Sequence, residues 1–267
     1  MIDFKGKVVL ITGASAGMGK EIARNISKEG CKLAIFARSE DKLKKLCDEI
    51  NSGRSQCIYK KCDVSNKQDV SEAVDYIIKN FGRVDIAFLN AGILVPNPIE
   101  TFDSEIITKT VKINFFGMVY FIEKLLPVMK KQKHSVIAVT STLPDKRGVP
   151  GWGAYGSSKA AISWLAESLR SEAYQKYNIE FITIKPGSVL TPMIENLYRP
   201  GSVRPEKAAE IIVNGVKKGK KVIQFPFLQK ISIQVRDILP PFAYDALPLD
   251  LMKGDGFPEP EEEKNES

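Results

Sequence analysis

Tyr155 and Lys159 stand four residues apart, a spacing that puts both side chains on one face of a helix. An unperturbed phenol has a pKa of about 10, and a cation held beside it favours the phenolate. A tyrosine with a fixed lysine neighbour can therefore exchange a proton at neutral pH, which makes Tyr155 a candidate general acid or base. A solvated surface pair has the same spacing, so the role depends on where the fold places the two residues.

A glycine-rich segment, TGASAGMG at residues 12–19, lies between an apolar run and an amphipathic stretch that reaches Glu29. Glycine lets the backbone turn sharply and approach a pyrophosphate, and the amino terminus of a helix attracts anions. The segment therefore predicts a dinucleotide site. Its candidate contact residues are Gly13, Ser15, Gly17, Met18 and Gly19.

Arg38 and Ser39 follow the second apolar run. An acidic residue at this point would bond the ribose hydroxyls of NAD, whereas a guanidinium and a hydroxyl suit a 2′-phosphate. The sequence therefore favours NADP(H) over NAD(H). The alternative is that Arg38 is a surface arginine at the end of a strand.

Short apolar runs alternate along the chain with amphipathic stretches of helical length, a pattern typical of an α/β protein. We expect a single Rossmann-like, doubly wound parallel sheet of about seven strands with helices on both faces. A helix is expected over 154–177, with Tyr155 in its first turn. Tyr155 then lies at the carboxyl edge of the sheet, where such folds bind ligands. The expected strands are 8–11, 33–36, 56–61, 84–89, 136–139, 181–184 and 222–225.

The chain has 267 residues, of which 43% are hydrophobic and 27% charged, so it can bury one large core. We expect one domain over 1–253 and a disordered acidic tail over 254–267. No apolar run suits a signal peptide or a membrane span, which predicts a cytoplasmic location. The net charge of +7 is spread among acidic residues without an RNA-binding motif, which argues against nucleic-acid binding.

Residue types that bind transition metals are few and badly spaced. The cysteines, Cys31, Cys47, Cys57 and Cys62, lack CxxC spacing, and the single histidine, His134, lies in a polar turn. We therefore expect no metal site and a solvated His134 without a catalytic role.

In order along residues 5 to about 195, these motifs resemble the short-chain dehydrogenase/reductase family. The resemblance rests on TGxxxGxG, Asp63-Val64, Asn90-Ala91-Gly92, Asn114, YxxxK and Pro186-Gly187. It implies hydride transfer with NAD(P) and Tyr155 as general acid or base. It further implies that Lys159 holds the nicotinamide ribose and lowers the pKa of Tyr155. Asn114, in a helix expected over 103–131, would position a water that links the lysine to solvent.

The resemblance also implies cofactor contacts beyond the glycine-rich segment. Asp63 and Val64 would contact adenine, Asn90 and Gly92 would line the cofactor, and Thr191 would bond the nicotinamide carboxamide. Tyr155 and Lys159 would belong to the same binding site. The segment after the sixth strand would add Pro186, Gly187 and Val189.

This chain departs from the family pattern at the catalytic serine, because Thr142 stands at that position, with Ser141 beside it. Threonine keeps the hydroxyl donor but adds a methyl group and a stiffer side chain. A shift of one residue would instead put Ser141 in the role. We favour Thr142 because Pro150 keeps the family's spacing to Tyr155.

In the expected reaction, NADPH delivers hydride to a carbonyl carbon while Tyr155 donates a proton and Thr142 hydrogen-bonds the same oxygen. Reduction is favoured over alcohol oxidation because the cofactor resembles NADPH. A sensor or scaffold that binds NADP without catalysis is the alternative from another class.

The substrate is expected to be a hydrophobic or lipid-like ketone or aldehyde. In the family, the segment after Pro186 folds over the substrate, and here residues 187–204 include Leu190, Met193, Ile194, Leu197 and Tyr198. In segment 227–252, Leu228, Ile231, Val235, Ile238 and Leu239 have helical spacing, which most often marks a core-facing helix. Extension of the pocket or contact with a membrane surface are the alternatives. The resemblance also implies a homodimer or homotetramer that pairs helices 103–131 and 154–177.

Overall fold

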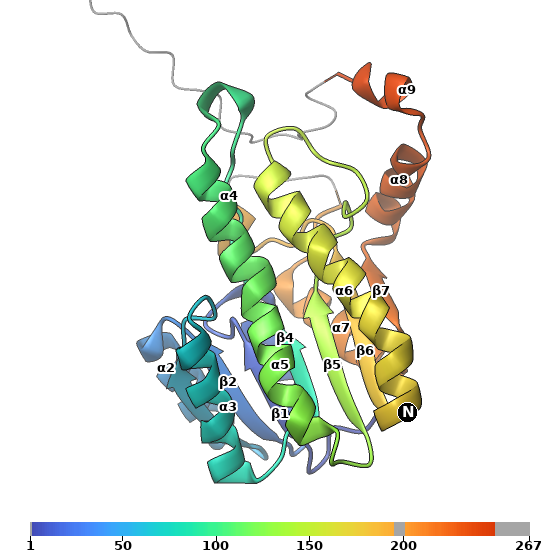
Figure 1. Ribbon diagram of the computed structural model, residues 1–267. Helices are drawn as coiled ribbons and strands as arrows, with labels where there is room; N and C mark the ends of the chain where they lie inside the picture. The colour runs from blue at the N-terminus through green and yellow to red at the C-terminus, as the bar shows by residue number, and fades with distance from the viewer. Residues whose placement is uncertain (1, 195–200, 249–267) are drawn as a thin grey trace, which may run out of the picture.

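The computed structural model describes residues 2–194 and 201–248. Its centre is one sheet of seven parallel strands in the order β3-β2-β1-β4-β5-β6-β7, which confirms the predicted fold class (Figure 1). The strands are β1 (Val8–Thr12), β2 (Lys32–Ala37), β3 (Gln56–Lys61), β4 (Ile86–Leu89), β5 (Ser135–Thr140), β6 (Ile179–Pro186) and β7 (Val222–Phe225).

Helices cover both faces of the sheet because the central strands are apolar on both sides. On one face, a buried cluster joins the sheet to α1 (Gly17–Ser27), α2 (Glu40–Asn51) and α7 (Pro205–Lys217). On the other, which faces the viewer in Figure 1, the cluster joins it to α3 (Lys67–Phe81), α5 (Gly117–Met129) and α6 (Gly153–Tyr177). The strand order reverses direction at β1, which creates a crevice between the carboxyl ends of β1 and β4.

The helix expected over 103–131 is divided into three parts. It runs as α4 (Ser104–Val111), a π-helical turn (Lys112–Phe116) and α5. Asn114 lies in the π-helical turn and is fully buried. Such turns are inserted where a helix must redirect a side chain, and they often occur at functional sites.

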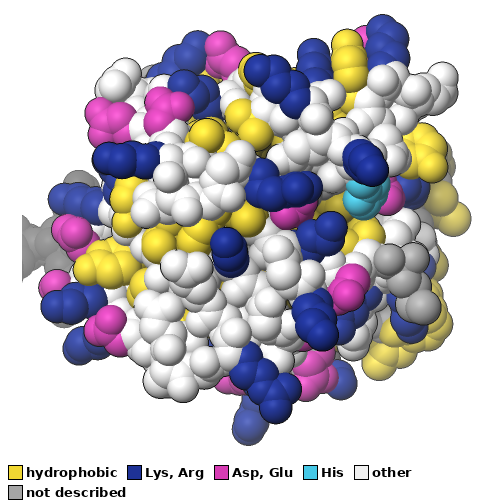
Figure 2. Space-filling model, turned by 90° about the horizontal axis from the view of Figure 1, so that it is seen from below, with side chains coloured by type: hydrophobic (Ala, Val, Ile, Leu, Met, Phe, Trp, Pro, Cys, Tyr) yellow, Lys and Arg dark blue, Asp and Glu magenta, His cyan; other side chains and the backbone are white. Residues whose placement is uncertain are grey.

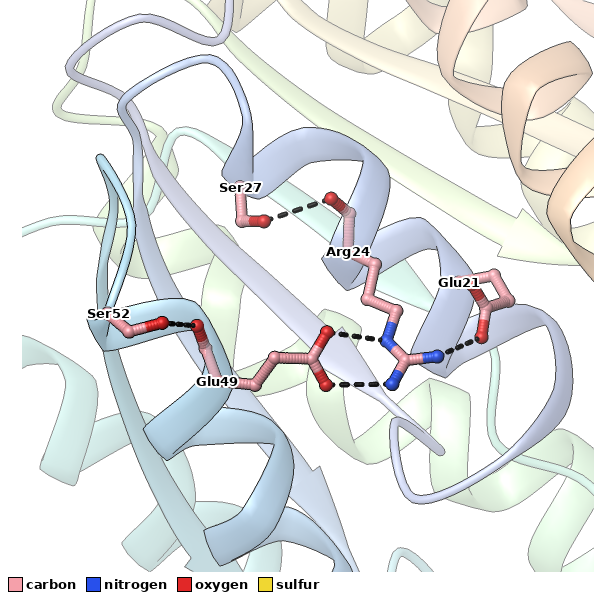
Figure 3. A network of polar contacts seen from close by, with 5 residues as sticks. All are labelled: Glu21, Arg24, Ser27, Glu49 and Ser52. Atoms are coloured by element: carbon pink, nitrogen blue, oxygen red, sulfur yellow. Dashed lines mark hydrogen bonds and ion pairs between the residues drawn. The ribbon is translucent and has the colours of Figure 1, made fainter.

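Helices α1 and α2 are joined by a polar network (Figure 3). Arg24 of α1 donates from Nε and Nη2 to the carboxylate of Glu49 in α2, at 2.9 and 2.7 Å, and from Nη1 to Glu21 at 3.0 Å. The Arg24 and Glu49 side chains are 37% and 49% exposed, so this network contributes at most about 1 kcal/mol. Its bidentate geometry still orients the two helices relative to each other.

The opposite end of the molecule, at the amino ends of the strands, carries lysine and arginine side chains interspersed with acidic ones (Figure 2). His134 lies here and is not simply solvated, because its Nε2 is 2.9 Å from Oε1 of Glu180. Lys221 pairs with the other oxygen of the same carboxylate. The side chain is 39% exposed, as expected for a solvated loop residue, but it also contacts Glu180, because β6 places that residue beside a turn that is distant in sequence.

The carboxy-terminal segment forms α8 (Phe227–Asp237) and α9 (Pro241–Asp245) at one side of the carboxyl edge (Figure 1). Leu228, Ile231, Val235 and Ile238 are 75%, 43%, 55% and 81% exposed, so the expected core-facing stripe faces outward instead. The expected tail, 254–267, and residues 249–252 lie outside the described residues. Within residues 2–194 and 201–248, no helix is both long and apolar enough to cross a bilayer.

Candidate active site

A groove of about 240 Å³ lies at the carboxyl ends of β1, β2 and β4. It brings together most of the residues that the sequence predicted for the cofactor: Gly13, Ser15, Gly17, Met18, Arg38, Ser39, Asp63, Val64, Asn90, Gly92 and Thr191. Its other lining residues were not predicted: Ala16, Ala37, Cys62, Ala91, Ile93, Ile113, Pro192 and Met193. Most of these are immediate neighbours of predicted residues, so the strand ends that were already recognised could have indicated them.

The groove depends on glycine at the turn after β1. Gly13 and Gly17 have φ angles of +69° and +54°, a region that disfavours side chains. A Cβ atom on Gly13 would lie 2.9 Å from Cα of Ala91, and one on Gly19 would lie 2.8 Å from Nδ2 of Asn90. Gly19 is not among the lining residues of the groove. Because it has no side chain, α1 can pack closely against Asn90, which follows β4. The turn thus leaves room for a ligand at the amino terminus of α1, where the helix dipole favours an anion.

Arg38 is exposed at one end of the groove, directly after β2. Ser39 beside it makes no capping hydrogen bond to α2. Burial acts to raise the pKa of Asp63, but hydrogen bonds from Ser65 and the positive charge of Arg38 outweigh it and lower the pKa. Asp63 therefore stays ionised and Arg38 contributes positive charge at this end of the groove.

Tyr155 and Lys159 lie in the first turns of α6, next to the carboxyl end of β5. The Lys159 Nζ donates to the carbonyl oxygen of Thr140 at 2.8 Å and lies 5.8 Å from the centroid of the Tyr155 ring. Lys159 is only 3% exposed. A Cβ on Gly92 would lie 3.3 Å from the same Nζ, so the lysine reaches the wall of the groove.

Burial controls the ionisation of this pair. It raises the pKa of Tyr155 to about 12, although a hydrogen bond with Thr142 acts in the opposite direction. It lowers the pKa of Lys159 to about 7. Desolvation disfavours the charged form of both groups, and the lowering of the tyrosine pKa by Lys159 that the family resemblance implies stays a prediction. At neutral pH the tyrosine is a protonated donor.

Thr142 and Ser141 point to different sides of the chain after β5. The Thr142 hydroxyl donates to the carbonyl oxygen of Pro186 at 3.5 Å, and it lies close enough to Tyr155 to lower the pKa of that phenol. The Ser141 hydroxyl instead donates to the carbonyl oxygen of Lys159 at 2.9 Å. Of the two alternatives, the structure therefore brings Thr142 to the tyrosine.

Asn114 connects the π-helical turn to the loop that follows β4 and to α6. Its Oδ1 accepts from the Ile93 N–H at 2.7 Å, and its Nδ2 donates to the Ile93 carbonyl at 2.9 Å and to Ser158 Oγ at 3.1 Å. These contacts satisfy the buried amide and hold the loop that carries Gly92 against the helix that carries Lys159.

A second cavity, of about 150 Å³, adjoins the groove, because Met18, Thr191 and Met193 line both. It contains Thr142 and Tyr155, together with Pro186, Gly187, Val189 and Ile194 from the segment that the sequence predicted. Leu190 is not among its lining residues, and Leu197 and Tyr198 lie outside the described residues. The remaining walls were not predicted: Leu94, Pro144, Val149, Trp152, Gly156, Ser188, Gln229 and Ile233.

Helix α8 forms one wall of this cavity through Gln229 and Ile233. The Gln229 Oε1 accepts from the Ser188 N–H at 2.9 Å. A Cβ atom on Gly187 would collide with the same oxygen, so glycine is needed for α8 to approach. Helix α8 thus reaches the cavity through Gln229 and Ile233, whereas Leu228, Ile231, Val235, Ile238 and Leu239, on which the pocket alternative rested, do not line it.

The described residues contain no group of three or more His, Cys, Asp or Glu side chains arranged to hold a metal ion. All four cysteines are buried and free.

Comparison with known proteins gives consistent results. A family model described as short chain dehydrogenase matches residues 7–200. The chain is 32% identical over 234 residues to an uncharacterized oxidoreductase of Listeria monocytogenes, covering 83% of this chain and 94% of the relative. It is 31% identical over 271 residues to the 3-ketodihydrosphingosine reductase of Dictyostelium discoideum, covering 90% of this chain and 80% of that enzyme.

Two solved structures are similar. A short chain dehydrogenase/reductase from Burkholderia phymatum in complex with NAD has a TM-score of 0.82 at 21% identity, covering 97% of this chain and 100% of that one, and supports the fold alone. An alcohol dehydrogenase from Thermococcus sibiricus, complexed with 5-hydroxy-NADP, has a TM-score of 0.75 at 28% identity, covering 83% and 95%.

Proposed function

The chain belongs to the short-chain dehydrogenase/reductase family, and we propose that this oxidoreductase uses NADPH to reduce a hydrophobic or lipid-like ketone or aldehyde. One observation carries the proposal. Tyr155 and Thr142 line the same largely apolar cavity, and this cavity adjoins the glycine-lined groove.

The groove residues fit a nicotinamide dinucleotide. Gly13 and Gly17 leave the backbone open where a pyrophosphate would approach α1, and Asn90, Gly92 and Thr191 line the path toward Lys159. Lys159 would hold the nicotinamide ribose, while Pro186, Gly187 and Val189 border the adjoining cavity. Asp63 and Val64 would contact the adenine, and Gly19 would support the turn from behind.

A preference for NADP(H) is supported by Arg38 and Ser39 at the end of β2. An exposed guanidinium and a hydroxyl that makes no capping bond suit a 2′-phosphate. One similar structure, from Thermococcus sibiricus, contains an NADP derivative.

The protein groups would act on the oxygen of the substrate. When bound, the cofactor supplies a hydride to the carbonyl carbon. Tyr155 is protonated at neutral pH, as an unperturbed phenol also is, and would donate its proton to the developing alkoxide. Thr142 would hydrogen-bond the same oxygen, and Lys159 and Asn114 would return the proton through water. Reduction is favoured over oxidation because the groove suits NADPH.

Two features support an apolar substrate. Leu94, Val149, Trp152 and Ile233 line the cavity, and they offer little to a polar molecule. One relative is named as a reductase of a keto sphingoid.

Assembly and location follow from the family and the sequence. We propose a homodimer or homotetramer through α4, α5 and α6. The proposal is supported by Trp164 of α6, which is 80% exposed, and by Phe116 of the π-helical turn between α4 and α5, which is 42% exposed. The proposed location is the cytoplasm, and the proposed single domain extends over 1–253.

The test is oxidation of NADPH by the purified protein against carbonyl compounds graded from short and polar to long-chain and cyclic, with NADH in parallel. We expect turnover to rise with chain length and to require NADPH. Tyr155→Phe should lower kcat by about 10³-fold. Tyr174→Phe, which alters an exposed tyrosine on the same helix, should not. Saturable NADPH binding without turnover in either direction would instead support a sensor or scaffold, and turnover only of alcohols would support a dehydrogenase.

A further inference from the structure

A buried polar cluster lies behind the catalytic residues and is not explained by hydride transfer itself. We define the Asp145 cluster as Ser141, Asp145, Ser163 and Lys185. Asp145 Oδ2 lies 2.6 Å from Lys185 Nζ, 2.6 Å from Ser163 Oγ and 3.4 Å from Ser141 Oγ. The side chains of Asp145 and Lys185 are 4% and 16% exposed.

The cluster joins three elements whose relative positions determine the geometry of the site. Asp145 belongs to the loop after β5, Ser163 to the middle of α6, and Lys185 to the end of β6. Ser163 Oγ also lies 2.7 Å from Ser141 Oγ. A charged pair at this depth costs desolvation, and apolar residues of similar volume often give equal stability. Stability therefore does not explain the Asp145–Lys185 pair, and we consider instead which neighbouring groups it orients.

The neighbouring groups are the catalytic ones. Ser141 Oγ donates to the carbonyl oxygen of Lys159, and the preceding residue, Thr140, accepts the Lys159 Nζ. Successive side chains of an extended chain point to opposite sides. Ser141 contacts the backbone of α6 at Lys159, whereas Thr142 lines the cavity together with Tyr155 from the first turn of the same helix. Holding Ser141 against α6 therefore also holds the next residue, Thr142, at a fixed place beside Tyr155.

We infer that Asp145, Ser163 and Lys185 are positioning residues, which act through Ser141 to hold Thr142 and Lys159 in register with Tyr155. The inference rests on the proposed function. It also explains why a serine is present beside the threonine that faces the tyrosine: Ser141 contacts the helix backbone while Thr142 reaches the substrate oxygen.

The first test is Ser163→Ala, with Ser171→Ala as the control at an exposed serine on the same helix. We expect Ser163→Ala to lower kcat about tenfold, while the Kd for NADPH stays within about twofold, because a misplacement of catalytic groups affects the chemical step more than binding. The control should change neither. A wild-type kcat in Ser163→Ala would overturn the inference.

A second test separates positioning from stability. Asp145→Asn alone leaves the Lys185 charge without its partner and is expected to unfold more easily. The double variant Asp145→Leu/Lys185→Met removes both charges, and its melting temperature should return toward that of the wild type while kcat stays low. If kcat returned with the melting temperature, the cluster would have a structural role only.

A third readout does not depend on turnover. Hydrogen exchange of the backbone amides over 155–163, measured with NADPH bound, should be faster in Ser163→Ala than in Ser171→Ala. If the wild type bound NADPH but reduced nothing, the proposed function would fail, whereas the cluster would still be judged by this exchange. Equal exchange in the two variants would contradict the cluster's role.

Discussion

The groove and the adjoining cavity are built in different ways. The groove is formed largely by backbone at the ends of neighbouring strands, and most of its lining residues come from the first 93 residues in sequence order. The cavity takes side chains from loops after β4, β5 and β6, and from α8 near the end of the chain. In the proposed function, the sheet edge would bind the cofactor, and the loops and α8 would bind the substrate.

Lys159 lies at the boundary between the groove and the cavity. The largest effect that we predict is that of its burial on the free energy of unfolding as the pH changes. Its folded-state pKa of about 7 is below the ordinary value of 10.5, so the unfolded chain binds more protons between these pH values. The contribution of this group to the free energy of unfolding should therefore rise between about pH 7 and about pH 10.5, by up to several kcal/mol, and should fall again over the same range as the pH is lowered.

The measurement is denaturant unfolding of the wild type and Lys159→Met from pH 6 to 10. The methionine variant should lack this rise, whereas Lys218→Met, at an exposed lysine, should keep it. Parallel curves for the wild type and Lys159→Met would show that the lysine is not desolvated.

Thr142 tests the cavity side of the boundary. Thr142→Ala should lower kcat about a hundredfold, because it removes a hydroxyl that would polarise the carbonyl. Ser141→Ala should lower it less, since that hydroxyl contacts the Lys159 backbone. Steady-state kinetics of both variants decides the ranking, and the reverse order would reassign the catalytic hydroxyl.

Arg38 tests the groove alone. Arg38→Gln should weaken NADPH binding about tenfold or more, because a charged hydrogen bond to the 2′-phosphate is lost. NADH binding should be almost unchanged. Fluorescence titration with both cofactors measures this, with Arg54→Gln as a control at an exposed arginine. An equal loss for NADH and NADPH would remove the basis for cofactor preference.

Ile233 tests the cavity alone and should have the smallest effect. Ile233→Ala enlarges the wall formed by α8 and should raise KM for an apolar substrate about fivefold, with NADPH binding unchanged. Ile231→Ala alters the outward face of the same helix and should leave KM as it is. Equal effects of the two substitutions would mean that α8 does not contact the substrate.

Three features could be predicted from the sequence alone: the order of strands and helices along the chain, the glycine turn after the first strand, and the Tyr155–Lys159 pair on one helix face. These features are local: apolar runs mark strands buried on both faces, glycine marks positive φ, and a spacing of four marks one helix face. Strand 56–61 and strand 222–225 were located to the residue, and the others within a few residues. The family and its oxidoreductase class followed from the order of the motifs and were confirmed by the comparisons.

Only the tertiary structure decided which of Thr142 and Ser141 meets the tyrosine, because the direction of a side chain after a strand depends on what packs on each side. It also decided that α8 turns Ile233 into the cavity and Leu228 outward, since helical spacing gives a face but not its partner. The raised pKa of Tyr155 has the same origin, because the desolvation that raises it is produced by residues far apart in sequence.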